Sequence, residues 1–247
     1  MVRNKKIISI GGGGFTHNTD KSLDQFVLNQ VNLKKFKIGF LPTASNDNKE
    51  KTDLFYKRFE NDFTELSHFN LCSKIDGFKE WFLNNDLIYV GGGNTFYMLE
   101  LWKKNNLIKI FEEGYDKGII LSGVSAGAIC WFDWMLSDSK GLGFKPLRGI
   151  NLISGSCTPH SSDGDRINQF QKHIKNSKLP EGIAIDDGVA VLFIDGKPSE
   201  VYSSRKNHDA YFIDKNKKIS LKDHIKNLWV KKFNQVKKFI VLRMLES

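Results

Sequence analysis

Residues 119–131 read IILSGVSAGAICW, an apolar run that leads into a single serine with glycines two positions away on either side. Residues 123–127 of this stretch, GVSAG, match the pattern G-x-S-x-G. In that pattern a serine stands on a sharp turn from a strand into a helix, and its neighbours must be small for the turn to close. The stretch therefore predicts a strand, a tight turn and a helix start, with Ser125 either a nucleophile or only a small turn residue.

Strand-like and helix-like segments alternate over the first two thirds of the chain. The apolar segments expected as strands are KIISI (6–10), KIGFLPT (37–43), LIYV directly after Asp86, and GIILSGV before Ser125. Helical spacing is found in LDQFVLNQV behind Asp20 as N-cap, in KEKTDLFYKRFENDF, and behind Asn94 or Thr95. This alternation predicts an α/β fold with a mostly parallel sheet flanked by helices on both faces. Because glycine-rich turns follow the strands, we expect a site at their carboxyl ends.

The last third of the chain has a different pattern. From about residue 180, GIAIDDGVAVLFIDGKPSEVYS alternates short β-rich runs with DG and GKP turns, which predicts β-hairpins. Residues 222–247 carry apolar side chains at helical spacing with lysines between them, which predicts a basic helix docked on its own domain. A helix for a membrane or partner surface is the alternative. We see no repeat or clear linker and expect a single domain over residues 1–247.

Composition narrows the class of protein. The 37 Lys and Arg residues exceed the 28 Asp and Glu residues, but the lysines are spread along the chain and no zinc, helix-turn-helix or RNA-binding pattern accompanies them. We therefore expect a solvated basic surface and no nucleic acid partner. Three cysteines without metal or CxxC spacing favour a reducing compartment. No apolar run approaches the roughly 20 residues of a membrane span, so we expect a cytoplasmic protein without membrane contact.

No cofactor or metal is expected from the glycine and histidine patterns. The cluster Gly11–Gly14 fails the dinucleotide pattern G-x-G-x-x-G, because Thr16 or His17 stands where the third glycine belongs. We interpret the cluster as a turn that lines the same crevice. The histidines are scattered and no HExxH motif occurs, so the sequence predicts no metal site.

A nucleophilic serine needs a base, normally a histidine that a carboxylate orients. Among the six histidines, His160 differs from the others because it lies in SGSCTPHSSDGD, a loop after a strand-like run, with Pro159 before it. Loops on a rigid scaffold are where catalytic groups are usually found. His160 is therefore the candidate base, with a structural or surface histidine as the alternative.

Four motifs occur in a characteristic order. YVGGGNTF is followed about 30 residues later by GVSAGA, then by PH and by GIAIDDG. This order resembles the peptidase E family of serine peptidases, which also contains the cyanophycinases, and the resemblance extends to about residue 215. It implies a fold like that of the class I glutamine amidotransferases, with serine in place of cysteine on the turn. Ser125 in that position speaks against an amidotransferase.

The resemblance also implies roles for particular residues. It makes Ser125 the nucleophile and His160 the general base. Two aspartates match positions implicated as the third member, Asp187 in IDDG and Asp138 in MLSDSK. We favour Asp187, because a carboxylate at a strand end is well placed to hold an imidazole, and its neighbour Asp186 is an alternative. Each of these aspartates could also be an ordinary turn residue.

Attack on a carbonyl creates an oxyanion that needs two N–H donors. We expect these donors to be the backbone amides of Ala126 and Gly92, the latter because only glycine allows so close an approach. A plain glycine-rich turn is the alternative for Gly92. Arg166 is the nearest match to the basic residue that receives a substrate carboxylate in the family's dipeptidases, and Asn94 is a further candidate contact to the substrate.

These observations predict a serine exopeptidase, most simply a dipeptidase that cleaves short peptides through an acyl-enzyme and needs no cofactor. A hydrolase of branched peptides, as in cyanophycinases, is one alternative. A catalytically silent relative that binds small ligands in the same crevice is the other. The sequence leaves the oligomeric state open.

Overall fold

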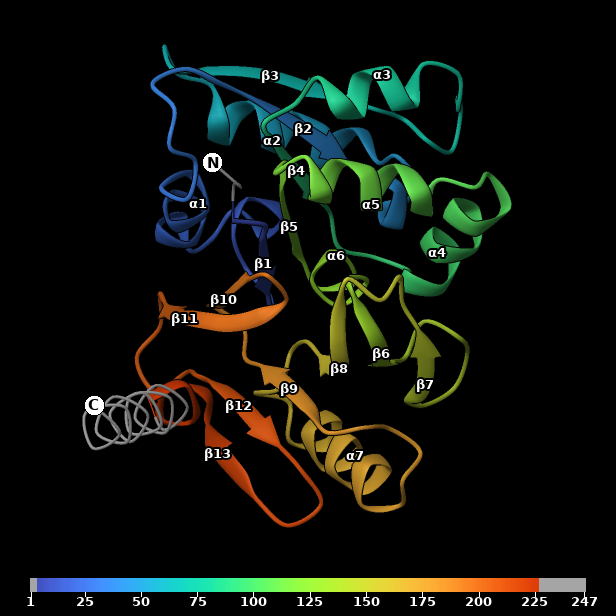
Figure 1. Cartoon of the computed structure of the whole chain (residues 1–247), viewed down its shortest axis with the longest axis vertical. Coiled ribbons are helices and arrows are strands. Elements are labelled where there is room, and N and C mark those ends of the chain that lie inside the picture. The colour runs from blue at the N-terminus through green and yellow to red at the C-terminus, as the bar shows by residue number, and fades with distance from the viewer. Residues whose placement is uncertain (1–3, 227–247) are drawn as a thin grey trace, which may run out of the picture.

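The computed structural model describes residues 4–226 and contains two β-sheets with helices packed on them (Figure 1). Within these residues, seven strands form the first sheet in the order β11-β10-β1-β5-β4-β2-β3. Their bounds are β1 (Lys6–Ile10), β2 (Phe36–Leu41), β3 (Thr64–His68), β4 (Leu87–Val90), β5 (Ile120–Val124), β10 (Val189–Ile194) and β11 (Lys197–Ser203). Strands β1, β5, β4, β2 and β3 are parallel, β10 pairs antiparallel with β1, and β11 pairs antiparallel with β10. The predicted α/β fold with a mostly parallel sheet is confirmed.

Helices cover both faces of this sheet. The helices are α1 (Lys21–Leu28), α2 (Lys49–Phe59), α3 (Phe78–Leu83), α4 (Thr95–Lys104) and α5 (Ile108–Asp116). Helices α1 and α2 pack with Ile8 and Phe40 on one face, and α3 to α5 pack with Ile7 and Ile88 on the other. Adjacent strand residues such as Ile7 and Ile8 are therefore both fully buried. Burial on both faces explains why these strands read as continuous apolar runs.

A second sheet, which sequence analysis did not predict, occupies the lower half of Figure 1. Within the described range its six strands follow the order β13-β12-β9-β8-β6-β7. They are β6 (Phe132–Ser137), β7 (Lys145–Arg148), β8 (Ile153–Thr158), β9 (Gly182–Ile185), β12 (Ala210–Ile213) and β13 (Lys218–Ser220), and α7 (Gly164–Lys175) packs on them. Some of these strands are short and largely exposed, as in KPLR of β7 and KIS of β13. They lack the apolar alternation that identifies a strand locally.

Only one of the two predicted hairpin turns is present. Strands β10 and β11 pair across Asp195 and Gly196, whose φ angles of 50° and 73° are both positive, as a tight DG turn requires. The IDDG turn is not a hairpin, because β9 and β10 belong to different sheets. The chain instead crosses between the sheets there, and Asp187 forms an isolated parallel bridge with Gly12.

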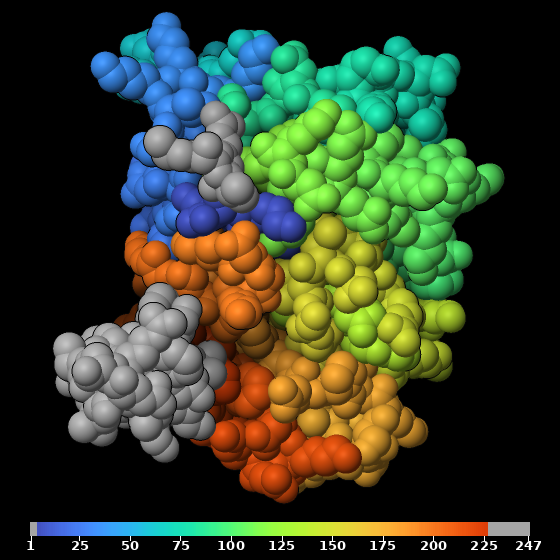
Figure 2. Space-filling view, in the orientation of Figure 1, coloured from blue at the N-terminus to red at the C-terminus, as the bar shows by residue number. Residues whose placement is uncertain are grey.

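The two sheets share one hydrophobic core. Phe132 of β6 and Phe193 of β10 meet edge to face with ring centroids 5.5 Å apart, and both belong to the same buried cluster. Figure 2 shows the β10–β11 hairpin in orange directly against the N-terminal strand in blue. Residues 221–226 are helical, and Leu221 and Ile225 are buried in this core. The rest of the helix predicted over residues 222–247 lies outside the described residues.

None of the helices described between residues 4 and 226 has the length and apolar character needed to cross a membrane.

Candidate active site

Ser125 stands on the sharp turn that its neighbours predicted. Strand β5 ends at Val124 and helix α6 (Ala126–Ile129) begins directly after the serine. Ser125 has φ 54° and ψ −112°, a conformation that residues other than glycine rarely adopt. A Cβ placed on Gly123 would collide with the Gly127 carbonyl, and one on Gly127 would collide with the Val90 carbonyl. The turn closes only because these two positions carry no side chain.

A histidine and an aspartate lie in line with the serine hydroxyl. The Ser125 Oγ is 2.8 Å from His160 Nε2, and His160 Nδ1 is 2.5 Å from Asp187 Oδ1. His160 follows β8, and Asp187 lies just after β9, so both come from the second sheet and the serine from the first. The carboxylate accepts the proton on Nδ1, which leaves Nε2 free to accept the serine proton.

Asp187 is ionised at neutral pH. The hydrogen bond from His160 lowers the pKa of its carboxyl, and this outweighs the partial burial that would raise the pKa. The positive charge of Arg205 lowers it further. An ionised carboxylate in this position stabilises the imidazolium that forms when His160 takes a proton.

Two backbone segments lie beside the serine side chain. A Cβ on Gly92, in the turn after β4, would be 3.2 Å from Ser125 Cβ, so this turn approaches the serine closely. Ala126 is the first residue of α6, and N–H groups in the first turn of a helix have no partner within the helix. The next glycine, Gly93, has φ 144°, and a Cβ there would collide with the Ala44 carbonyl. The predicted oxyanion donors Gly92 and Ala126 thus flank Ser125.

Asp138 does not reach His160, which corrects one of the two choices for the third member. Its carboxylate accepts a hydrogen bond from Arg166 Nη2 at 2.8 Å instead. Asp186 also points elsewhere, since it accepts hydrogen bonds from Ser161 Oγ at 2.6 Å and from the Asp209 amide at 3.1 Å. Among the three aspartates considered, only Asp187 contacts the imidazole.

Arg166 is largely buried and paired with an aspartate. Its side chain is only 8% exposed, forms an ion pair with Asp138, and lies over the Phe144 ring at 4.5 Å from the centroid. The guanidinium is therefore largely shielded from solvent, and one of its nitrogens is already bonded to a carboxylate. A contact between Arg166 and a substrate carboxylate stays a prediction.

Comparison with known proteins identifies the family. The model of peptidase family S51 matches residues 7–201 of this chain. The chain belongs to peptidase family S51. The resemblance to the peptidase E family that the motifs indicated is thereby confirmed, and family membership supports a peptidase, a hydrolase of peptide bonds.

Individual relatives of this S51 chain agree with the family. The uncharacterized peptidase YgaJ of Bacillus subtilis (strain 168) is 39% identical over 210 residues, which cover 84% of this chain and 91% of the relative. Peptidase E of Haemophilus influenzae is 28% identical over 131 residues, 51% of this chain and 59% of that protein. The crystal structure of a peptidase from an acI-B1 actinobacterium matches the fold with a TM-score of 0.63 at 19% identity, covering 89% and 98% of the two chains.

Asn94 has a structural role in the S51 chain. It is the N-cap of α4, where its Oδ1 accepts a hydrogen bond from the Tyr97 amide at 2.9 Å, and its own amide donates to the Ala44 carbonyl. These bonds fix the turn that carries Gly92. A contact between Asn94 and substrate stays a prediction.

Sequence analysis missed an ion pair beside Asp187. Asp20, expected as the side-chain cap of α1, makes no such cap and accepts two hydrogen bonds from Arg205 instead. These two residues are 185 positions apart, so no local pattern relates them.

Gly12 was expected only to line the crevice. A Cβ there would collide with the Asp187 carboxylate and lie 2.8 Å from His160 Nδ1.

Among residues 4–226, no group of three or more histidine, cysteine or acidic side chains is arranged to hold a metal ion.

Proposed function

We propose that this S51 family member is a serine peptidase that cleaves short peptides through an acyl-enzyme. The observation that carries the proposal is the continuous chain of contacts from Ser125 Oγ to His160 at 2.8 Å and from His160 to Asp187 at 2.5 Å. Both distances are those of hydrogen bonds, and the order of groups is that of a nucleophile, a base and a carboxylate that orients the base.

The chemistry follows from this geometry. Ser125 Oγ attacks the carbonyl carbon of the peptide bond while His160 Nε2 takes the hydroxyl proton. The amides of Ala126 and Gly92 donate hydrogen bonds to the oxyanion that forms. His160 then gives its proton to the leaving amine, the C–N bond breaks and the acyl group stays on Ser125. A water molecule then attacks the acyl carbon while His160 takes its proton; the bond from that carbon to Ser125 Oγ breaks, and His160 returns the proton to Oγ as the acid leaves.

The size class of the substrate rests on the family and not on the site. The resemblance to peptidase E dipeptidases and the relative named peptidase E favour removal of short units from a chain end. Specificity for an N-terminal aspartate through Arg166 has no direct support in the site, because that guanidinium is already paired with Asp138.

The serine mechanism is tested with a fluorophosphonate probe, which reacts with activated serines. Wild type is expected to be labelled and Ser125→Ala is not, while Ser73→Ala, at an exposed serine outside the site, is labelled like wild type. No labelling of wild type, or equal labelling of Ser125→Ala, would overturn the proposal and favour a catalytically silent relative.

The substrate class is tested separately. Wild type and Ser125→Ala are compared on a library of dipeptides, tripeptides and branched isopeptides. Ser125-dependent hydrolysis of linear dipeptides supports the dipeptidase version. Cleavage confined to branched substrates would replace it with the cyanophycinase-like alternative.

A further inference from the structure

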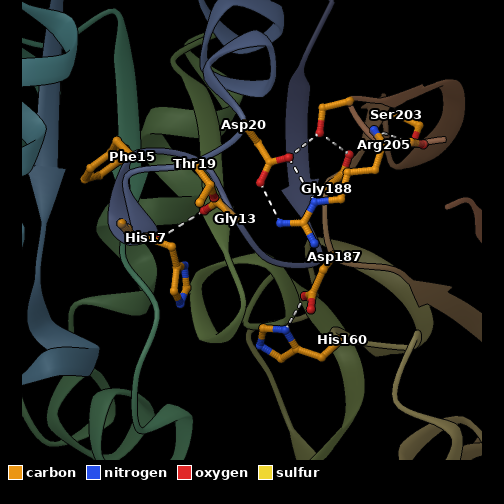
Figure 3. Close-up of polar contacts among 12 residues, drawn as sticks. Gly13, Phe15, His17, Thr19, Asp20, His160, Asp187, Gly188, Ser203 and Arg205 are labelled. Carbon is orange, nitrogen blue, oxygen red and sulfur yellow. Dashed lines mark hydrogen bonds and ion pairs between the residues drawn. The ribbon is translucent and has the colours of Figure 1, made fainter.

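A second charged pair lies directly behind the Asp187 carboxylate. Arg205 Nε donates to Asp20 Oδ1 at 3.0 Å, and Arg205 Nη2 donates to Asp20 Oδ2 at 2.7 Å. Two parallel hydrogen bonds between a guanidinium and a carboxylate fix the relative orientation of both groups. Figure 3 shows Asp187 between this pair and His160.

The segment that carries Arg205 holds the residue next to Asp187. The Ser204 amide donates to the Gly188 carbonyl at 2.8 Å, and the Gly188 amide donates to the Gly12 carbonyl at 2.8 Å. The stem of Arg205 packs on Gly188 so closely that a Cβ there would be 2.6 Å from Arg205 Cγ and Cδ. Gly188, with φ 76°, is thus fixed from both sides, and Asp187 with it.

The glycine turn separates the two carboxylates. A Cβ on Gly12 would collide with Asp187, and a Cβ on Gly13 would collide with Asp20. Each carboxylate therefore packs against a bare backbone position of the same turn. This close packing gives a structural reason for Gly12 and Gly13, which have no role in the proposed catalytic steps.

The Asp187 carboxylate faces charged and titratable groups from more than one segment. Arg205 adds positive charge beside Asp187, Asp20 offsets that charge, and His17 is a further titratable side chain near this carboxylate. Asp186 is turned away, toward Ser161 and the Asp209 amide. A change at Arg205 or Asp20 therefore alters the net charge close to the Asp187–His160 pair.

We propose that Arg205, anchored by Asp20, is a positioning residue for the active site: it fixes the Asp187–Gly188 segment against the Gly12–Gly13 turn and places a balanced charge beside His160. The inference rests on the proposed function, since it gives Asp187 the task of orienting the base.

The two members of the pair have effects of opposite sign. Arg205→Gln leaves the Asp20 anion unpaired, which favours the imidazolium, so His160 becomes an active base only at higher pH. Asp20→Asn leaves the Arg205 cation uncompensated, which disfavours the imidazolium and moves the onset of activity to lower pH. A unit charge a few ångströms away in largely aqueous surroundings shifts such a midpoint by about half a pH unit.

The experiment measures the rate of fluorophosphonate labelling between pH 5 and pH 9. Arg205→Gln is expected to move the acidic midpoint up by about half a unit and Asp20→Asn to move it down by a similar amount. Arg205→Lys retains the charge but not the two parallel hydrogen bonds, so it keeps the wild-type midpoint and loses rate on the plateau. Arg148→Gln breaks the ion pair between Arg148 of β7 and Asp133 of β6, far in sequence from the Asp20–Arg205 pair, and is the matched control that leaves the profile unchanged.

Unchanged midpoints in both variants, or shifts in the same direction, would overturn the positioning role. If one variant fails to fold, as a thermal melt would show, the shift of the other variant decides. Titration of the His160 ring by NMR is a readout independent of labelling. Unlabelled wild type would overturn the proposed function, whereas labelled wild type with unmoved midpoints would overturn only the role of Arg205.

Discussion

Two residues of the proposed relay have backbone conformations that side chains disfavour. Ser125 has φ 54° and His160 has φ 51°. Such conformations cost about 1–3 kcal/mol each and persist only where the surrounding structure imposes them. The site therefore lies where the fold stores strain, which suits a nucleophile that must project from a tight turn.

This strain predicts a difference between two inactive variants. Ser125→Gly relieves the backbone, whereas Ser125→Ala retains a Cβ in the same conformation. We expect Ser125→Gly to be more stable than Ser125→Ala by about 1 kcal/mol, measured by urea unfolding at neutral pH. A lower free energy of unfolding for the glycine variant would contradict strain at this position.

The third member of the relay is tested by two matched aspartate variants. Asp187→Asn is expected to slow probe labelling by about 10³–10⁴-fold, because an amide stabilises the wrong tautomer of His160 and no longer balances its charge. Asp138→Asn removes only the partner of Arg166, so its labelling rate should stay within about tenfold of wild type. A larger loss of labelling rate in Asp138→Asn than in Asp187→Asn would indicate that Asp138 is the third member of the relay.

Gly12 is expected to tolerate not even the smallest side chain without loss of activity. In Gly12→Ala the new methyl group displaces the Asp187 carboxylate from His160, and displacements of about 1 Å at a catalytic group cost about 100-fold in rate. Gly164→Ala is the control, because nothing lies within 4 Å of a Cβ there. Labelling of Gly12→Ala at the wild-type rate would contradict the expected collision between the new methyl group and the Asp187 carboxylate.

At the scale of elements, three separate chain segments meet at the Asp20–Arg205 pair. Asp20 precedes α1, Arg205 follows β11, and Gly188 lies between β9 and β10. Hydrogen bonds from Arg205 hold the pKa of the Asp20 carboxyl well below its usual range. A carboxyl whose pKa falls on folding stabilises the folded state above its unfolded pKa, and this contribution disappears as pH falls through the folded pKa.

The pair therefore predicts a pH-dependent effect on stability. Asp20→Asn should lower the free energy of unfolding by about 1–2 kcal/mol at pH 7, the range for hydrogen bonds to a charged group that is partly exposed. The difference from wild type should shrink below about pH 4, where the unfolded carboxyl is protonated. Urea unfolding at pH 7, 5 and 3 measures it, and a difference that grows on acidification would contradict the ion pair.

At the scale of the whole molecule, the two sheets depend on one core. Phe132 of the second sheet is 1% exposed and contacts Phe193 of the first. Phe132→Ala should cost about 3–5 kcal/mol and leave a single cooperative unfolding transition, because the cavity opens between the sheets. Phe63→Ala, at a side chain that is 60% exposed, should change stability by less than about 0.5 kcal/mol. Two separate transitions in wild type would contradict the predicted single domain.

The parts of the fold that could be predicted are those whose signals are local. The parallel strands β1, β2, β4 and β5 are buried on both faces, so each is a continuous apolar run. The DG turn of the β10–β11 hairpin and the turn at Ser125 follow from backbone sterics within a few residues. The strand β7 could not be predicted, because its largely exposed sequence KPLR becomes a strand only by pairing with β6.

The sequence by itself determined the candidate nucleophile and, through the ordered motifs, the candidate base. Only the tertiary structure decided between Asp187 and Asp138, moved IDDG from a hairpin to a crossing between sheets, and joined Asp20 to Arg205. The reason is physical: the His160–Asp187 bond spans 27 positions and the Asp20–Arg205 bonds span 185. Which polar groups meet over such separations depends on how the two sheets pack, and no local steric or periodic signal carries that information.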